Sequence, residues 1–148
     1  MKKTNHTKTS ILTLALFFVS LCGMAADVPK SKDQQNIQGD WVGESGTSNG
    51  FKLEEVVGCH YVFSGDRLAI RDKTGKEMKF LFKLDTSSRP KLLVQRPEQA
   101  LTNATLCNVA YELNGDTLKI AMANPGTRPT GMSDKEQMVI IFKRKKMR

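Results

Sequence analysis

The strongest constraint on the fold of this chain is a two-residue alternation of apolar and polar side chains, which recurs in short runs up to residue 144. Cys59, Tyr61 and Phe63 share one parity, and the same pattern returns in runs at 67–71, 79–84, 91–95, 107–113, 118–122 and 138–144. Successive side chains of a β-strand point to opposite faces, so each run is predicted to be a strand with one apolar face. The turn-forming residues between the runs predict an antiparallel meander.

About eight such strands have to bury one apolar face each. A sheet that closes into a barrel achieves this and removes the exposed edges, whereas a two-sheet sandwich is the competing architecture. We predict an all-β fold, a small antiparallel up-and-down β-barrel of about eight strands, with its domain at residues 37–144. The polar segment 26–36 is predicted to be a flexible lead-in, and residues 145–148 a basic tail.

Two segments repeat one hairpin pattern, with Tyr, Gly, Asp, Leu and Ile at the same offsets. They are YVFSGDRLAI at 61–70 and YELNGDTLKI at 111–120. Gly65 and Gly115 are predicted to take positive φ at the turns, and Asp66 and Asp116 to hydrogen-bond nearby backbone. A pair of catalytic carboxylates is disfavoured, because a Gly-Asp turn already explains both residues.

The N-terminus has the pattern of a secretory signal peptide. Three lysines and no acidic residue precede the apolar run 11–21, and the small residues Gly23 and Ala25 follow. We expect a leader at residues 1–25 and a periplasmic or secreted mature protein. The run is shorter than the roughly 20 apolar residues that span a bilayer, which disfavours a membrane anchor. A lipoprotein attached through Cys22 is disfavoured because the bulky Leu21 precedes it.

Cys59 and Cys107 are the two cysteines that remain after leader removal. In an oxidising compartment an even number of cysteines is compatible with a disulfide. Two separate buried thiols explain the residues equally well, because a free cysteine packs as a small hydrophobe. Both interpretations stay open at this point.

The formal net charge of the whole chain is +8, but the only dense basic run is 143–146, near the C-terminus. A solvated tail explains this run better than nucleic-acid binding does, and export makes nucleic acid less plausible still. The partners we expect are a small hydrophobic ligand, an envelope protein or an anionic surface. We expect a monomer that neither binds nucleic acid nor spans a membrane.

Several linked motifs resemble one protein family. Gly39-Asp40-Trp41 is similar to the Gly-x-Trp that opens the first strand of lipocalins. The two hairpins, the segment FKLDTSSRPK between them and the Arg-Pro-Thr loop at 128–130 resemble a large family of uncharacterised secreted lipocalin-like proteins, common in planctomycete-type bacteria. The resemblance covers roughly residues 37–144 and implies a small barrel, with no established activity. It also implies that Trp41 packs at the closed barrel end under Arg144 as a structural cation–π pair.

Catalytic patterns are absent from the sequence. His60 is the one histidine after the leader, and its neighbour Cys59 must point to the opposite face of a strand. No nucleophile elbow, phosphate-binding loop or metal-ligand spacing occurs. We therefore expect no enzyme activity, no cofactor and no metal.

The sequence is compatible with two functions of different classes, a binding protein and a structural or interaction module. A lipocalin-like binding protein would hold a small apolar ligand, whereas an envelope interaction or structural module would have a filled barrel; we favour the first. A cavity above roughly 300 Å³ would distinguish the binding protein. The predicted ligand-lining residues are Tyr61, Phe63, Phe80, Phe82, Val109, Tyr111, Ile120 and Met122. Arg128, in the long loop 123–133, would either tie that loop down or contact a carboxylate or phosphate.

Overall fold

The computed structural model describes residues 31–99, 106–124 and 126–146. The predicted leader at 1–25 and residues 26–30, like Cys22, lie outside these ranges. The elements in chain order are α1 (Lys32–Asn36), β1 (Gly39–Ser48), β2 (Phe51–Lys52), the 3₁₀-helix η1 (Glu54–Val56), β3 (His60–Ser64), β4 (Arg67–Arg71), β5 (Glu77–Asp85), β6 (Leu92–Pro97), β7 (Cys107–Asn114), β8 (Thr117–Ala123) and β9 (Gln137–Arg144).

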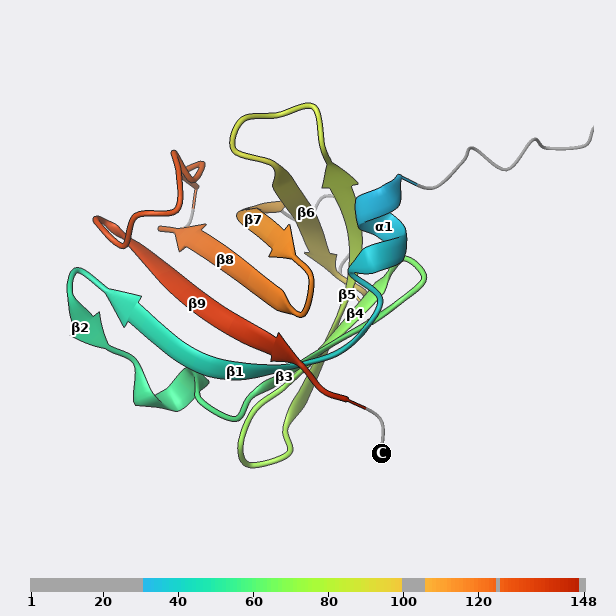
Figure 1. Cartoon of the computed structure of the whole chain (residues 1–148), viewed down its shortest axis with the longest axis horizontal. Coiled ribbons are helices and arrows are strands. Elements are labelled where there is room, and N and C mark those ends of the chain that lie inside the picture. The colour runs from blue at the N-terminus through green and yellow to red at the C-terminus, as the bar shows by residue number, and fades with distance from the viewer. Residues whose placement is uncertain (1–30, 100–105, 125, 147–148) are drawn as a thin grey trace, which may run out of the picture.

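The strands of the described ranges form one closed antiparallel barrel (Figure 1). Their order is β2-β1-β3-β4-β5-β6-β7-β8-β9, and β1 also pairs with β9. That closing ladder runs from Trp41↔Arg144 to Ser48↔Met138. The two-residue strand β2 lies outside the eight-strand barrel, paired with the end of β1. The predicted small up-and-down barrel is confirmed, and the sandwich is excluded.

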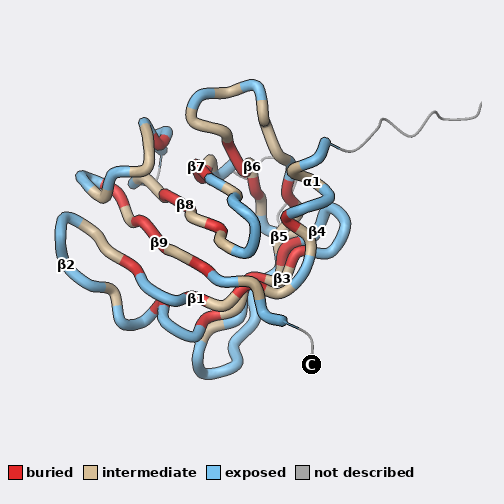
Figure 2. Tube along the Cα trace, in the orientation of Figure 1, coloured by how far each residue is buried: buried red, intermediate tan, exposed pale blue. Residues whose placement is uncertain are grey.

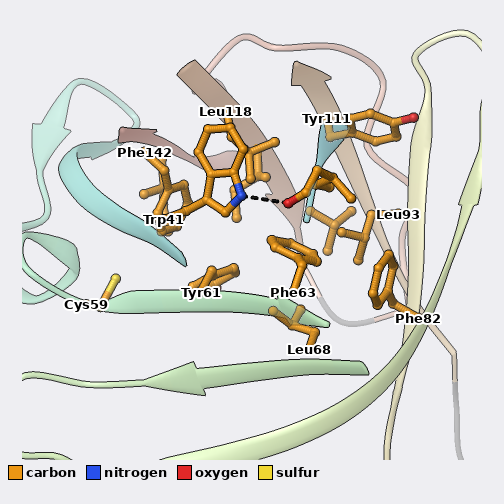
Figure 3. Close-up of a cluster of buried hydrophobic side chains, with 14 of the residues drawn as sticks. Trp41, Cys59, Tyr61, Phe63, Leu68, Phe82, Leu93, Tyr111, Leu118 and Phe142 are labelled. Carbon is orange, nitrogen blue, oxygen red and sulfur yellow. Dashed lines mark hydrogen bonds between the residues drawn. The ribbon is translucent and has the colours of Figure 1, made fainter. Parts of the chain in front are cut away.

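The barrel interior is filled by side chains of the predicted apolar faces (Figure 3). Tyr61 packs on Phe142 with ring centroids 4.5 Å apart, and Phe63 meets Phe82 edge-on at 5.1 Å. Most of the predicted ligand-lining residues belong to this cluster. Those that are buried in it are Tyr61, Phe63, Phe82, Val109, Tyr111 and Ile120, with Phe80 and Met122 partly buried against it.

One end of the barrel is covered by α1, where the sequence predicted a flexible lead-in (Figure 1). The side-chain oxygen of Ser31 caps the helix by accepting from the Gln34 amide. Gln34 and Gln38 both donate to the carbonyl of Gly65 in the β3–β4 turn. The predicted flexible lead-in is therefore wrong for residues 32–36. A helix of five residues is too short to leave a helical periodicity in the sequence, and its contacts with the barrel stabilise it.

The opposite, open end is narrowed by η1, which packs against the inner face of β1. A Cβ atom on Gly43 would lie 2.1 Å from the carbonyl oxygen of Val56, and one on Gly46 would lie 2.4 Å from the Val56 Cγ2. Val56 is buried in the core cluster, with Leu53 packed against it. These two glycines therefore make room for η1 inside the barrel.

A second, smaller cluster lies on the outer face of β6 to β9. Leu92, Ala110, Ala121 and Val139 are buried there. Figure 2 shows buried positions along each of these strands. Met132, from the β8–β9 loop, packs against them, and the Gln137 side chain donates to the Gly131 carbonyl at 2.9 Å. The loop thus folds back over the outside of the barrel.

A candidate ligand site at the open end of the barrel

The closed end is sealed by Trp41 and Arg144, as the resemblance implied. The Arg144 guanidinium carbon lies 4.2 Å from the centroid of the wholly buried Trp41 ring. The Trp41 Nε1 donates to the Ile37 carbonyl at 2.7 Å, and Arg144 donates to the carbonyls of Asn36 and Gln38 at 2.5 and 2.6 Å. The side-chain nitrogens of Trp41 and Arg144 are hydrogen-bonded to other residues of the protein. The geometry therefore supports the structural role that was predicted for this cation–π pair.

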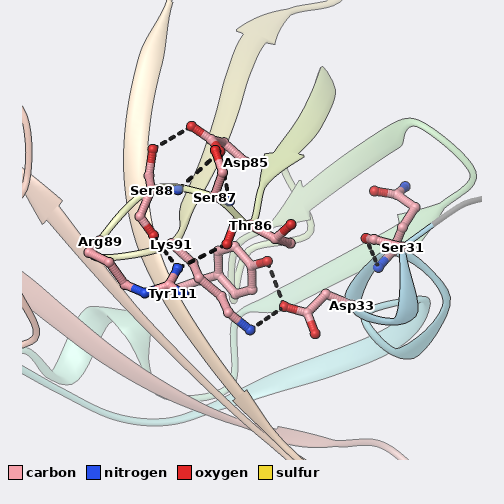
Figure 4. A network of polar contacts seen from close by, with 10 residues as sticks. Ser31, Asp33, Asp85, Thr86, Ser87, Ser88, Arg89, Lys91 and Tyr111 are labelled. Atoms are coloured by element: carbon pink, nitrogen blue, oxygen red, sulfur yellow. Dashed lines mark hydrogen bonds and ion pairs between the residues drawn. The ribbon is translucent and has the colours of Figure 1, made fainter.

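A polar network ties α1 to the same end (Figure 4). The Tyr111 hydroxyl and the Lys91 Nζ each donate to the Asp33 Oδ2 at 2.8 Å. Burial alone would raise the pKa of Asp33, but the hydrogen bonds from Lys91 and Tyr111 outweigh it and hold that pKa below its usual value. Burial, with the bond to Asp33, raises the pKa of Tyr111. Tyr111 was predicted to line the ligand site, but its hydroxyl fastens the helix through Asp33.

The two repeated hairpins agree only in part with the prediction. Gly65 and Gly115 have φ of 65° and 56°, as predicted. Asp116 accepts from the Arg144 Nε at 3.1 Å instead of from nearby backbone, and Asp66 makes no side-chain hydrogen bond within the described residues. The backbone bonds predicted for the two carboxylates are therefore wrong, because Arg144 competes for one and the other is solvated.

Two hollows open at the other end of the barrel, where β8 ends and β9 begins. Their volumes are about 550 and 410 Å³, and both are lined by Met122, Ala123, Asn124 and Met138. The larger hollow is completed by Leu106, Cys107, Asn108, Gly126, Thr127 and Arg128. The smaller is completed by Ser48, Asn49, Leu53, Glu55, Glu136 and Gln137.

These hollows exceed the size predicted for a binding protein, but their location differs from the predicted one. Of the eight predicted lining residues, all of them within the described ranges, Met122 alone lines either hollow. Met138 was missed, although it shares the inward parity of Ile140 and Phe142. The larger hollow is the candidate site because its lining combines apolar side chains with polar groups at the edge.

Arg128 connects two loops and also lines the larger hollow. Its Nη2 donates to the Ser88 Oγ at 2.9 Å, and Ser88 is held in turn by Asp85 (Figure 4). Hydrogen bonds from Ser87 and Ser88 lower the pKa of Asp85 to about 2. Arg128 therefore ties its loop down, which was one of its two predicted roles. Its partner is the Ser88 hydroxyl rather than a backbone carbonyl or an acidic side chain.

The two cysteines are not joined in the structure. Cys59 is a buried thiol at the edge of the core cluster, and burial raises its pKa (Figure 3). Cys107 is exposed and lines the larger hollow. The structure therefore agrees with two separate thiols rather than with a disulfide, although only Cys59 is buried.

No catalytic arrangement involves His60 within the described residues. Its Nδ1 contacts the Asp40 Oδ1 at 2.8 Å, outside the barrel, whereas Cys59 is buried. Within the described ranges, no group of three or more His, Cys, Asp or Glu side chains could hold a metal ion. No helix of these ranges is long and apolar enough to cross a membrane.

Comparison with known proteins adds no relative: no protein-family model, no curated protein and no solved structure matches the chain. The lipocalin-like resemblance therefore stays a prediction beyond the barrel fold itself.

Proposed function

We propose that this protein is an exported, lipocalin-like binding protein that holds a small apolar ligand at the open end of its barrel. The observation that carries the proposal is the hollow of about 550 Å³ between β7, β8 and the start of the β8–β9 loop. Small-molecule sites are concave and mostly apolar, with volumes of roughly 300–1,000 Å³. The hollow falls within that range.

The ligand is placed at the open end because the interior offers little room elsewhere. The aromatic and aliphatic side chains predicted to line a cavity pack against one another as core. The closed end is occupied by Trp41, Arg144 and the contacts of α1. Entry and binding are therefore assigned to the opposite end.

The lining of the larger hollow favours an apolar ligand of variable shape. Met122 and Met138 have flexible, polarisable side chains, which adapt to irregular apolar surfaces. Asn108 and Thr127 place uncharged polar groups at the same hollow. Export follows from the leader pattern of the sequence and is part of the proposal.

Binding of the uncharged fluorophore N-phenyl-1-naphthylamine tests this function. We expect its emission to increase on binding, and the double variant Met122→Gln/Met138→Gln to bind about tenfold more weakly through lost apolar contact. Met78→Gln is the matched control, because Met78 is 48% exposed and lines neither hollow. Circular dichroism establishes that each variant is folded.

The filled interior favours the alternative, an envelope interaction or structural module without a ligand. If the wild-type protein gives no saturable increase in emission, the binding function is wrong and the alternative takes its place. Equal binding by the double variant and the control would show that the fluorophore binds elsewhere.

A further inference from the structure

The two hollows at the open end of the barrel differ in charge. Arg128 lines the larger one, and no carboxylate of the described residues joins it there. The smaller hollow is lined by the carboxylates of Glu55 and Glu136, without a cation from the described ranges. Met122 and Met138 line both hollows, which therefore adjoin across an apolar wall. Such an arrangement orients a ligand that has one charged end.

The charge of Arg128 is not neutralised by an ion pair within the described residues. Its Nη2 donates to the Ser88 Oγ at 2.9 Å, and this hydroxyl donates in turn to the Asp85 Oδ2. The Asp85 carboxylate thus lies behind Ser88, one hydroxyl away from the guanidinium. Because a guanidinium carries five N–H donors, Arg128 keeps donors with which to bind a ligand.

The hydrogen bond to Ser88 holds the cation at the hollow. Ser88 is itself held by Asp85, through its amide at 3.2 Å and through its hydroxyl. Hydrogen bonds from Ser87 and Ser88 keep Asp85 ionised, with a pKa of about 2. At neutral pH the Ser88 hydroxyl therefore gives its hydrogen to Asp85 and accepts from Arg128. A side chain that is already positioned loses less conformational entropy when a ligand binds.

The polar groups of the larger hollow fit a carboxylate. A planar guanidinium donates two parallel hydrogen bonds to the two oxygens of a carboxylate. Asn108 lines the same hollow, and its side-chain amide, which makes no hydrogen bond within the described residues, can donate to the same group. One cation balances the single negative charge of a carboxylate, whereas a phosphate monoester carries about −1.5 to −2 at neutral pH.

Other head groups fit the larger hollow less well. An alcohol or an amide would leave the charge of Arg128 without a counter-ion. An ammonium group would be repelled by Arg128 and attracted to Glu55 and Glu136 in the smaller hollow. A carboxylate is attracted by the larger hollow and repelled by the smaller one, so both hollows favour the same orientation.

We propose that Arg128 binds the carboxylate of a ligand whose body is apolar, and that this body packs against Met122 and Met138. The ligand would lie in the larger hollow, outside the filled interior of the barrel. This inference rests on the proposed binding function and names the class of ligand, a monocarboxylate with an apolar chain.

Displacement of N-phenyl-1-naphthylamine by decanoate and decanol tests the assignment, because the two probes have chains of equal length and differ in the head group. Arg128→Met removes the cation and keeps an unbranched apolar stem. We expect it to bind decanoate about fivefold more weakly, the upper range for a solvent-exposed ion pair, with unchanged affinity for decanol and the fluorophore. In the wild-type protein, added salt should weaken decanoate binding and leave decanol binding unchanged.

Two variants separate the charge of Arg128 from its contact with the β5–β6 loop. Arg89→Met removes another arginine of this region, which donates to the carbonyls of Thr86 and Ser88 but lines neither hollow, and it should leave decanoate affinity unchanged. Ser88→Ala breaks the contact and keeps the cation, so it should weaken decanoate binding by no more than about twofold. Circular dichroism establishes that each variant is folded.

Decanoate affinity that stays unchanged in Arg128→Met, or that falls together with decanol affinity, would overturn the proposal. A loss of about fivefold in Arg89→Met or Ser88→Ala would do the same, because neither variant removes the cation at the hollow. If Arg128→Met weakens the binding of decyl phosphate more than that of decanoate, the carboxylate is the wrong head group. Failure of the wild-type protein to bind the fluorophore would instead overturn the proposed function.

Discussion

Replacing Arg144 with Met should loosen the closed end of the barrel and expose the only tryptophan of the chain. The substitution removes the cation from the Trp41 face, a contact that contributes about 0.5–2 kcal/mol. It also removes two charge-assisted hydrogen bonds to the carbonyls of Asn36 and Gln38, where water can take over part of the bonding. The exposed ion pair with Asp116 adds little. The expected loss is about 2–4 kcal/mol in the free energy of unfolding.

Thermal melting and tryptophan emission measure this loss. For a domain of this size, that change lowers the melting temperature by roughly 8–16 °C. The Trp41 emission should shift to longer wavelength, because α1 loses its anchor at Asn36 and the segment between α1 and β1 loses its anchor at Gln38. Arg144→Lys keeps the charge but not the planar fork, so it should fall between the wild type and Met.

Lys143→Met is the matched control, because Lys143 is exposed and its side chain contacts Thr117. It should melt within about 1 °C of the wild type, as surface substitutions usually do. An Arg144→Met variant that melts with the wild type and keeps its emission wavelength would refute the role given to this side chain.

Two further perturbations probe the same end of the barrel. Trp41→Ala should cost about 3–5 kcal/mol by leaving a cavity in the core, seen as a lower urea midpoint, and an unchanged midpoint would contradict the packing described here. Because the folded-state pKa of Asp33 lies below its usual value of 3.8, its stabilising effect is present above that pH and is lost as the pH falls through the folded pKa. In the Asp33→Asn variant, the urea midpoint should therefore fall less steeply than in the wild type as the pH drops from about 5 to 2. Parallel curves of urea midpoint against pH for the two proteins would argue against the network.

The barrel could be predicted from the sequence because strand parity is a local property. Tyr61, Phe63, Leu118 and Ile120 have to share an interior whatever the detailed packing, and the structure buries all of them. Trp41 and Arg144 could be paired because they sit at the start of the first strand and the end of the last. Closure of the barrel makes those two positions cross-strand partners.

The filled interior, the open-end hollows and helix α1 could not be predicted, because they depend on packing and on contacts between residues far apart in the sequence. Parity says which side chains face inward but not whether they fill the barrel, so core residues were predicted to line a cavity. The burial of Gln95 could not be predicted, because Leu92 and Val94 are also apolar, on the outer face beneath the β8–β9 loop, and this blurs the alternation of β6. Helix α1 was missed because its anchors, such as Gly65 and Lys91, lie far away in the sequence.

The location of the ligand is tested most directly by methyl NMR of the methionines, with N-phenyl-1-naphthylamine added to the folded protein. Binding at the open end should shift the methyl resonances of Met122 and Met138, which line both hollows. Met132, beneath the loop on the outer face, should stay unchanged. Shifts confined to Met132 or Met78, or no saturable shift at all, would contradict a binding site at the open end of the barrel.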